Sequence, residues 1–387
     1  MLKNKTILQI VPSLQNGGVE RGVLEVSRYV VENNCKSIVI SSGGRLEHMI
    51  NKYGGKHYKL SVHSKNPFRW NNLRKKIEII IKEESVDLIH VCSRVPAWIA
   101  FPLSSKLNLP IISSVHGRFR KGNFLKNYYN SVLIKCDKII AISNHIRTNI
   151  ISVFPNSKSK IKIIHRGVDQ SLFDPSNISA SRIINQSKLM GVDYGKSVIL
   201  MASRPSLWKG HVYLIKALVK VKSDFQCILI GAKDGNVAFK NQLFKLIEKL
   251  NLGNRIQLTP STNDIQAALM LGDVIVMPSI DPEPFGRIIV EAQSLGKVVV
   301  GFNHGGISET IIDGKTGFLA EPKNIDSLAE KLQIALSLKS SDRNKISKFS
   351  KKVVETKFSH VKMCQETFEL YEKCINEYEI KNKIKIK

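Results

Sequence analysis

The feature that most constrains the fold of this chain is a regular alternation between short apolar runs and longer amphipathic segments. The short runs are rich in Val, Ile and Leu, and most are apolar at every position rather than at every second one. Such runs are typical of strands that are buried on both faces of a parallel sheet. The expected strands are Thr6–Val11, Ser37–Ser41, Leu88–Val91, Ile111–Val115, Lys138–Ile142, Ile161–Ile164, Ser197–Ala202, Gln226–Ile230, Ile256–Leu258, Val274–Met277 and Lys297–Gly301.

Longer segments with a helical pattern separate these strands. Strand–helix–strand alternation repeated this often predicts an α/β fold with doubly wound parallel sheets. The clearest of the expected helices are Val19–Asn33, Asn71–Glu84, Lys126–Cys136, Lys209–Val221, Lys240–Leu250 and Phe285–Leu295.

The alternation pauses once, at about residues 168–195, where the sequence becomes polar and rich in Ser and Asn. Because 387 residues suit two domains, we place the division at this pause. The prediction is a Rossmann-like domain at 1–168, a linker at 169–195 and a second Rossmann-like domain at 196–358. Residues 359–387 are expected to form a terminal helix and a basic tail that pack back on the first domain.

Composition excludes several other classes of protein. Charged residues make up 24% of the chain and hydrophobic residues 43%, which argues against disorder. No apolar run approaches the roughly 18 to 20 residues of a membrane span, and the first apolar run has no signal-peptide cleavage pattern after it. The six cysteines show no CxxC spacing, so we expect reduced, inert thiols rather than disulfides or a zinc site.

The net charge of +27 is unevenly distributed. Residues 1–170 hold 28 Lys and Arg against 10 Asp and Glu, whereas residues 171–330 hold 17 against 15. A one-sided basic surface favours an anionic partner, such as a phosphorylated substrate, anionic lipid or nucleic acid. A general enrichment in lysine would give the same total without any partner, so the charge alone does not choose among these.

Two loops carry residues that suit a phosphate ligand, and doubly wound sheets bind ligands at the loops that follow their strands. After the first strand, Gly17 and Gly18 open a helix where backbone N–H groups can approach an anion. After the strand Ser197–Ala202, Arg204 and Lys209 lie five residues apart and could clamp a diphosphate. The glycine pair could equally belong to a simple turn, and Arg204 and Lys209 could be an ordinary pair of basic surface residues. Neither loop alone therefore establishes a phosphate site.

Two glutamates follow the strand Val274–Met277. Glu283 precedes an expected helix start at Pro284, and Glu291 lies about two turns into that helix among apolar residues. A buried carboxylate is unfavourable without a partner, so Glu291 is predicted to bind a ligand. Glu283, in the loop, is expected to reach other hydroxyl groups of the same ligand.

These residues together resemble the signature of a known family, the retaining GT-B glycosyltransferases of family 4. The resemblance covers most of the chain and is most specific between residues 200 and 320. The interdomain segment at residues 164–169 also resembles that of the family, but it has Arg166 where Asn is usual, so we assign no role to Arg166. The matching motifs are Gly17-Gly18-x-Glu20, Ser-Arg204-x4-Lys209-Gly, Glu283-Pro-Phe-Gly-x4-Glu291-Ala, Gly305-Gly306-x2-Glu309 and Asp313-Gly314-x2-Gly317.

The resemblance implies a GT-B architecture, in which two Rossmann-like domains face each other across a cleft. A nucleotide-sugar donor would be held mainly by the C-terminal domain and an acceptor mainly by the N-terminal one. In this chain, Glu291 would hold the ribose hydroxyls. Arg204 and Lys209 would neutralise the diphosphate, with help from backbone N–H groups of Gly17 and Gly18.

The remaining donor-site residues follow from the same resemblance. Glu283 would bind the sugar hydroxyls, supported by the backbone of Phe285 and Gly286, and Arg287 lies in the same donor-binding segment. His116, which follows the strand Ile111–Val115, stands where the family often has a histidine near the transferred sugar. A hydrogen-bonded loop histidine without a catalytic role is the alternative for His116.

The implied activity is transfer of a sugar from a UDP- or GDP-sugar to a hydroxyl of a lipid-linked or saccharide acceptor, with retention of configuration. The implied process is synthesis of lipopolysaccharide or another cell-envelope glycan. Departure of the nucleoside diphosphate builds negative charge, which fixed cationic side chains can stabilise. The family needs no obligate metal, and this chain has no DxD triplet, of which Asp281-Pro-Glu283 is the nearest approach. The resemblance therefore implies neither a metal ion nor another cofactor.

The basic N-terminal half suits docking on an anionic membrane surface. The stretches Asn66–Lys76 and Arg118–Tyr129 mix basic and aromatic residues, as interfacial segments do. We therefore expect a cytoplasmic protein at the cytoplasmic face of the inner membrane.

Two other functional classes stay open. A GT-B-fold nucleotide-sugar epimerase or hydrolase would turn over its donor without an acceptor. A nucleic-acid-binding protein is suggested only by a pI near 9.8, with no recognisable binding motif, so no nucleic-acid partner is expected.

Overall fold

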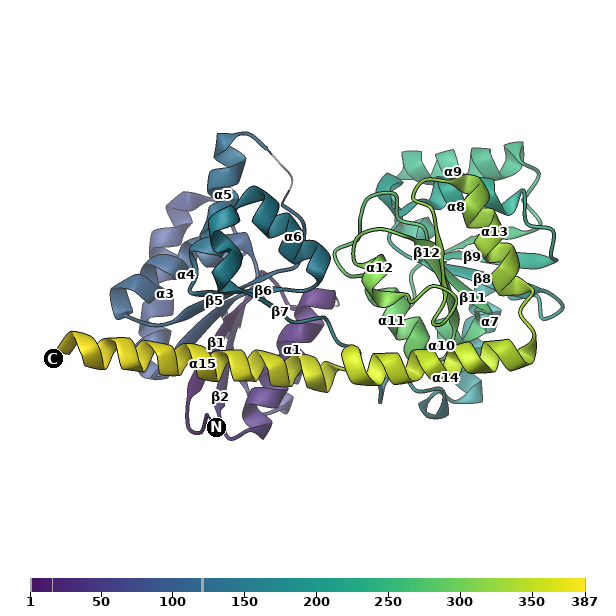
Figure 1. The fold of residues 1–387 in the computed structure, drawn as a ribbon. Coiled ribbons are helices and arrows are strands. Elements are labelled where there is room, and N and C mark those ends of the chain that lie inside the picture. The colour runs from purple at the N-terminus through teal and green to yellow at the C-terminus, as the bar shows by residue number, and fades with distance from the viewer. Residues whose placement is uncertain (1, 16, 120–121, 387) are drawn as a thin grey trace. The chain divides into compact units, whose positions relative to one another are not determined.

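The computed structural model contains two parallel β-sheets, one in each of two structural units (Figure 1). The structure describes residues 2–15, 17–119 and 122–386, with side chains described up to residue 382. The N-terminal unit consists of residues 1–167 and 360–387, and the C-terminal unit consists of residues 168–359.

The sheet of the N-terminal unit has the strand order β3-β2-β1-β4-β5-β6-β7, and every described pair of neighbours is parallel. Helices cover both faces, and the central strands are buried along their whole length, which explains their continuous apolar runs. The strands are β1 (Thr6–Ile10), β2 (Lys36–Ser41), β3 (Lys56–Lys59), β4 (Leu88–Val91), β5 (Ile111–Val115), β6 (Lys138–Ala141) and β7 (Ile161–Ile163).

One face of this sheet is covered by α1 and by the terminal helix α15, whose apolar side chains share a core with residues of the central strands (Figure 1). Tyr29 of α1 and Phe368 of α15 pack edge to face, with ring centroids 5.8 Å apart. The helices are α1 (Gly18–Glu32), α2 (Glu47–Lys52), α3 (Trp70–Glu83), α4 (Arg94–Leu107), α5 (Phe124–Lys135), α6 (Asn144–Val153) and α15 (His360–Ile386), with 3-10 turns η1 (Pro67–Arg69) and η2 (Pro155–Lys160).

The sheet of the C-terminal unit has the order β10-β9-β8-β11-β12-β13, again with parallel neighbours. In both sheets the first strand of the unit is the third from one edge, and the chain winds first toward that edge and then toward the other. The strands are β8 (Ser197–Ala202), β9 (Phe225–Ile230), β10 (Ile256–Thr259), β11 (Val274–Met277), β12 (Val298–Phe302) and β13 (Phe318–Ala320).

The expected linker is part of the C-terminal unit. Residues 169–195, the expected linker, lie within this unit and contain η3 and α7, and α7 packs against α10. The helices are α7 (Ala180–Met190), α8 (His211–Leu218), α9 (Val237–Lys249), α10 (Ile265–Leu271), α11 (Arg287–Ser294), α12 (Ile307–Thr310), α13 (Ile325–Leu336) and α14 (Ser340–Lys357), with 3-10 turns η3 (Pro175–Asn177), η4 (Leu207–Lys209) and η5 (Ala232–Asp234).

The structure confirms all eleven expected strands to within one residue at each end and adds β3 and β13. The short strand β3 is an edge strand of Lys, His and Tyr, so it lacks the apolar run by which the others are recognised. The expected helix start at Pro284 is wrong, because α11 begins at Arg287. Gly286 has φ +91°, a left-handed conformation that an α-helix cannot contain, so Glu291 lies only one turn into the helix.

Each sheet has one point where the winding direction reverses, between β1 and β4 in the N-terminal unit and between β8 and β11 in the C-terminal unit. In open α/β sheets, ligands bind beyond the carboxyl ends of the strands at this point, because the two flanking loops diverge and leave a crevice. A ligand of either unit is therefore expected at the loops that follow these four strands.

Candidate functional site

In the C-terminal unit, the loops after β8 and β11 meet in an ion pair. Lys209 Nζ lies 2.6 Å from Glu283 Oε1, and Ser279 Oγ donates a hydrogen bond to the same oxygen at 2.6 Å. Glu283 is only 5% exposed, so the Lys209 charge and the Ser279 hydroxyl compensate its desolvation. The second carboxylate oxygen, Oε2, accepts no hydrogen bond within the described chain, which leaves it able to bind a ligand hydroxyl.

The loop that carries Lys209 is held tightly against the loop after β11. Ile280 N–H donates to the Trp208 carbonyl at 2.8 Å, which joins the two loops through the backbone. Gly210 has φ +84°, and a Cβ atom built there would lie 1.8 Å from the Pro278 carbonyl oxygen. Only glycine fits this close approach, so the position of Lys209 depends on Gly210.

Replacing Gly210 with alanine is expected to destabilise the protein by about 3 kcal/mol or more, because the left-handed backbone and the contact with the Pro278 carbonyl act together. Urea unfolding measures the change. The matched control is Gly253→Ala, since a Cβ there would meet no atom within 4 Å, and its effect should stay within about 0.5 kcal/mol. Equal effects of the two substitutions would contradict this account of the loop.

Residues of the loop after β12 hold the main chain of the Glu283 loop in place. Gly306 N–H donates to the Glu283 carbonyl at 2.7 Å, and His304 Nε2 donates to the Ser279 carbonyl at 2.6 Å. Gly305 has φ +61° and lies close to the Glu283 backbone. The glycine pair of the family motif Gly305-Gly306-x2-Glu309 therefore supports the Glu283 loop in the structure.

The other predicted donor residues of this unit are placed differently. Glu291, 5% exposed, accepts a hydrogen bond on Oε1 from Arg287 Nε at 2.6 Å, and its Oε2 has no described partner. Phe285 is buried, and Gly286 caps α11. Arg204 is exposed and makes no hydrogen bond or ion pair with any described residue. The structure thus joins Lys209 to Glu283, whereas Arg204 and Glu291 form no described hydrogen bond or ion pair with either residue.

In the N-terminal unit, Gly17 and Gly18 lie at the start of α1, as predicted. Neither has a positive φ, so the glycine pair is not required by backbone strain. Space is restricted instead, because a Cβ on Gly17 would lie 2.3 Å from the Glu20 carboxylate. The Gly18 carbonyl accepts a hydrogen bond from Arg166, whose guanidinium occupies the space that a Cβ on Gly22 would need.

His116 follows β5 and lines a pocket of about 210 Å³ at the carboxyl ends of β1, β4 and β5. The pocket is also lined by Glu20 of α1 and by Ser93 and Arg94 at the start of α4. The His116 side chain is partly buried, and its Nε2 atom is inaccessible to solvent and has no partner in the described chain. His116 is thus placed where a ligand of the N-terminal unit could reach it.

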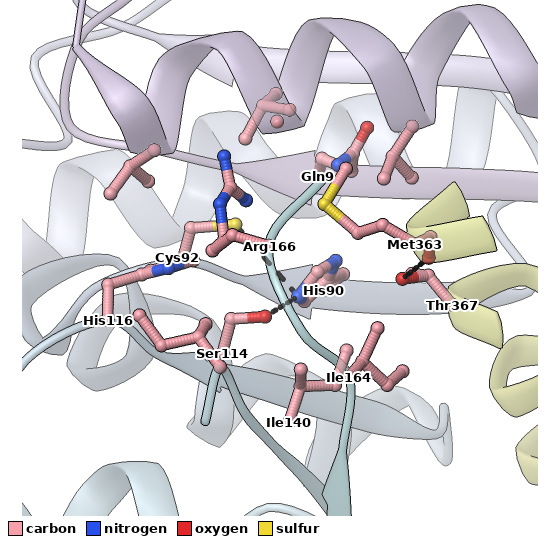
Figure 2. Close-up of a pocket in the computed structure, with 15 residues that line it drawn as sticks. Gln9, His90, Cys92, Ser114, His116, Ile140, Ile164, Arg166, Met363 and Thr367 are labelled. Atoms are coloured by element: carbon pink, nitrogen blue, oxygen red, sulfur yellow. Dashed lines mark hydrogen bonds between the residues drawn. The ribbon is translucent and has the colours of Figure 1, made fainter. Parts of the chain in front are cut away.

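A second, smaller cavity of about 30 Å³ lies beside this pocket and shares Val19, Cys92, Ser114 and His116 with it (Figure 2). Figure 2 shows Gln9, His90 and Ser114 around it, with Met363 and Thr367 contributed by α15. Its volume suits one or two ordered water molecules, which need polar partners. Gln9, 1% exposed, offers both amide atoms without another described partner.

The polar side chains of this cavity form a row on one face of the sheet. Side chains two residues apart on a strand share a face, so Gln9, His90 and Ser114 continue the apolar row of Ile7, Leu88 and Ile112. His90 Nε2 lies 2.7 Å from Ser114 Oγ, and His90 Nδ1 lies 2.6 Å from the hydroxyl of Tyr371 in α15. A hydrogen-bonded chain therefore runs from the terminal helix to the strand that precedes His116.

Burial keeps His90 and His116 of the N-terminal unit and His211 of the C-terminal unit neutral. It lowers the pKa of His90 to about 3 and that of His211, behind the Lys209 loop, to about 4. The pKa of His116 also lies well below its usual value, because of burial and, secondarily, the positive charge of Arg166. At neutral pH each ring therefore carries one N–H donor and one acceptor nitrogen.

The lowered pKa values predict a loss of stability on acidification. Below pH 6.5 the unfolded chain binds protons at these histidines that the folded protein rejects, so the free energy of unfolding should fall as the pH decreases from 6.5 toward 4. Each such histidine contributes up to about 1.4 kcal/mol per pH unit. Urea unfolding at pH 7.5, 6.0 and 5.0 measures the slope.

His90→Gln should reduce this slope, whereas His63→Gln, at an exposed position, should leave it unchanged. The slope, rather than the stability at any one pH, is the readout, because His90→Gln also alters the contacts with Tyr371 and Ser114. An unchanged slope in His90→Gln would show that His90 is protonated in the folded protein.

Several residues of the N-terminal unit were not singled out from the sequence. Gln9 and His90 each interrupt an apolar strand with one polar residue, and that interruption is the signal by which both could have been found. Arg94 and Tyr371 carry no such signal, because their roles depend on which strands and helices become neighbours.

The cysteines, possible metal sites and possible membrane spans complete the description. All six cysteines are buried with free thiols, as their scattered spacing predicts, and burial raises the pKa of Cys92 to about 12. Within residues 2–15, 17–119 and 122–386 there is no cluster of three or more His, Cys, Asp or Glu side chains suited to a metal ion. No helix in the described chain is long and apolar enough to cross a membrane.

Comparison with known proteins identifies the family. Residues 16–172 match the sequence profile described as Glycosyltransferase Family 4, and residues 185–353 match the profile described as Glycosyl transferases group 1. The protein named spore coat protein SA in Bacillus subtilis (strain 168) is 27% identical over 76% of this chain and 80% of its own length.

Solved structures agree over nearly the whole chain. A glycosyltransferase from Rickettsia africae ESF-5 is 36% identical, with a TM-score of 0.87 over 97% of this chain and 99% of its own. Anabaena Alr3699/HepE in complex with UDP-glucose has the same fold, with a TM-score of 0.81 at 24% identity over 95% of this chain and 99% of its own. With both profiles matched in order and a solved glycosyltransferase 36% identical along its length, this chain belongs to the GT-B glycosyltransferases of the family 4 and group 1 type.

Proposed function

We propose that this glycosyltransferase moves a sugar from a nucleoside diphosphate sugar, bound by the C-terminal unit, to a hydroxyl of a lipid-linked or saccharide acceptor bound by the N-terminal unit. The observation that carries the proposal is the Lys209–Glu283 pair, formed at the reversal point of the second sheet. A cation and a carboxylate side by side suit a diphosphate joined to a polyhydroxylated sugar. The UDP-glucose bound by Anabaena Alr3699/HepE is a donor of this class.

The chemistry follows from the charges. The bond between the sugar C1 and the phosphate oxygen breaks, and its electron pair goes to the phosphate. Lys209 and Arg204 stabilise the charge that develops there, while Glu283 Oε2 and Glu291 Oε2 accept hydrogen bonds from donor hydroxyls. This leaves the charge stabilisation to side chains, so we propose a metal-independent reaction.

The new bond forms between C1 and the acceptor oxygen on the face that the phosphate leaves, so the anomeric configuration is retained. The proton of the acceptor hydroxyl passes to the departing phosphate oxygen. In this proposal neutral His116 hydrogen-bonds the transferred sugar, a role supported by its lowered pKa and by its position in the pocket of the N-terminal unit. We place the reaction in the synthesis of lipopolysaccharide or another cell-envelope glycan.

The decisive experiment is a thermal-shift and turnover screen with UDP-, GDP- and ADP-sugars. One donor class should stabilise the full-length protein, and its turnover should rise strongly when a saccharide or lipid-linked acceptor is added. Turnover that is equally fast without an acceptor would indicate a hydrolase or an epimerase instead. Stabilisation by none of the donors would refute the proposed donor site.

A surface of the N-terminal unit suits contact with an anionic membrane, at the cytoplasmic face of the inner membrane. Phe68 is 93% exposed and Phe124 81% exposed, and both have basic neighbours in sequence. They belong to η1 and α5, on either side of α4, which packs against both α3 and α5. Of the basic residues expected in this region, Arg120 and Lys121 lie outside the described residues.

Vesicle binding tests this membrane contact. The protein should co-sediment with vesicles rich in phosphatidylglycerol, and binding should weaken steeply between 50 and 300 mM salt. The double variant Phe68→Ser, Phe124→Ser should bind about 10-fold more weakly, because both rings lose their place at headgroup depth. Phe244→Ser, an exposed phenylalanine of the C-terminal unit, is the control and should bind normally. Salt-independent binding would argue against an anionic lipid surface.

A further inference from the structure

The 210 Å³ pocket of the N-terminal unit is lined by an arginine, Arg94, that the reaction described above does not use. Arg94 is the first residue of α4 and lines this pocket with Ser93, Glu20 and His116. The pocket lies beyond the carboxyl ends of β1 and β4, at the reversal point of the sheet, where a ligand is expected. Arg94 therefore belongs to the unit to which the proposed function assigns the acceptor.

No described residue of the protein neutralises the charge of Arg94. Its Nε donates to the Asn130 amide oxygen at 2.5 Å, and its guanidinium carbon lies 5.3 Å from the centre of the Phe119 ring. Both partners are uncharged, and no described carboxylate lies within ion-pair distance of Arg94. An arginine has five N–H donors, so the four on its terminal nitrogens remain without a described partner.

The environment makes this arrangement unfavourable without a ligand. Arg94 is partly buried, and burial lowers the pKa of its guanidinium because the charged form loses hydration. A desolvated cation is usually retained where an anion binds to it. The Asn130 contact and the Phe119 ring also hold the guanidinium in place, which reduces the entropy that a ligand would have to remove.

The adjoining groups favour a phosphate. Ser93, which also lines the pocket, is the N-cap of α4, and its side chain makes no capping hydrogen bond. The positive end of the α4 dipole lies at the same place. A planar carboxylate can use the arginine fork alone, whereas a tetrahedral phosphate can also accept hydrogen bonds from donors on another side.

We propose that this pocket binds a phosphate group of the acceptor, with Arg94 as the residue that selects it. The proposal rests on the proposed function, because it takes the pocket as the acceptor site. Glu20 and His116 line the same pocket and suit hydroxyl groups, so the acceptor is a phosphorylated polyol rather than a simple phosphate. Arg94 thus confers specificity and does not take part in breaking the donor bond.

A ligand-observed ³¹P NMR titration of the full-length protein tests the proposal without any nucleotide sugar. The probes are D-glucose 6-phosphate and inorganic phosphate. D-glucose 6-phosphate should bind more tightly than inorganic phosphate, and unphosphorylated D-glucose should not displace it. Displacement by D-glucuronate at equal concentration would overturn the choice of phosphate over carboxylate.

Variants locate the bound phosphate. Arg94→Gln should weaken binding of D-glucose 6-phosphate at least 10-fold, and Arg94→Lys, which keeps the charge but loses the fork, should weaken it less. Arg45→Gln, an exposed arginine of the same unit, is the control and should bind like the wild type. If Arg94→Gln does not fold, the comparison of Arg94→Lys with Arg45→Gln still decides the question.

A variant of the C-terminal unit tests whether the phosphate binds at the donor site instead. Lys209→Met should leave binding of D-glucose 6-phosphate unchanged if the phosphate lies beside Arg94. Loss of binding in Lys209→Met together with normal binding in both Arg94 variants would place the phosphate in the donor site and refute the proposal. Because this titration uses no donor, a negative result would not contradict the proposed sugar transfer. Conversely, a negative donor screen would not change the interpretation of the titration.

Discussion

Replacing Lys209 with methionine is expected to lower kcat by about 100- to 1,000-fold, because the charge that develops on the departing phosphate loses one of the two cations that we assign to it. The same substitution leaves the buried Glu283 carboxylate with Ser279 as its only described partner. Stability should therefore also fall, by about 3 kcal/mol. Turnover of the best donor and urea unfolding measure the two effects.

A second substitution separates these effects. In Lys209→Met combined with Glu283→Gln, the buried charge is gone, so most of the lost stability should return while kcat stays low. Lys216→Met, an exposed lysine of α8, is the matched control and should resemble the wild type in both assays. Recovery of kcat in the double variant would show that Lys209 acts only by holding Glu283.

Replacing Glu291 with alanine is expected to abolish stabilisation of the protein by any UDP-, GDP- or ADP-sugar. A carboxylate that accepts hydrogen bonds from two ribose hydroxyls contributes roughly 1.5–3 kcal/mol for each bond, so donor affinity should fall at least about 100-fold. A ligand present at 100 times its Kd stabilises a protein by about 2.7 kcal/mol, which a thermal shift detects easily. The same ligand concentration should give no measurable shift in Glu291→Ala.

The control for this variant is Glu248→Ala, which removes an exposed carboxylate of α9 in the same unit. Its donor-induced shift should equal that of the wild type. Glu291→Ala could also disturb Arg287, its partner on the same helix, so the melting temperature without ligand must be compared. A normal donor shift in Glu291→Ala would remove Glu291 from the donor site.

The strands were predictable because burial on both faces requires an apolar side chain at every position. Runs such as Val274–Met277 and Ile111–Val115 satisfy that requirement, and the structure places their ends within a residue of the expected positions. β3 was missed because it lies at the edge of its sheet, where charged residues are tolerated. The start of α11 was misplaced because the sequence does not reveal that Gly286 adopts a left-handed conformation.

The pairing of Lys209 with Glu283 could be expected only in part. Both residues follow parallel strands, whose carboxyl ends lie at the same edge of a sheet, and this places them on the same side. That β8 and β11 are neighbours, although two strands lie between them in the sequence, is a property of the sheet order. The same holds for the row of Gln9, His90 and Ser114, which joins three strands far apart in the chain.

The sequence by itself determined the fold class, the positions of the buried strands and the residue types of the donor motifs, because each depends on local spacing and burial. Tertiary structure decided which of those residues touch. It paired Lys209 with Glu283, left Arg204 without a hydrogen bond or ion pair to either of them, and brought Tyr371 of the terminal helix to His90. It also left Arg94 without an ion-pair partner among the described residues, because whether a carboxylate lies near a side chain depends on every segment packed against it, and no local pattern encodes that.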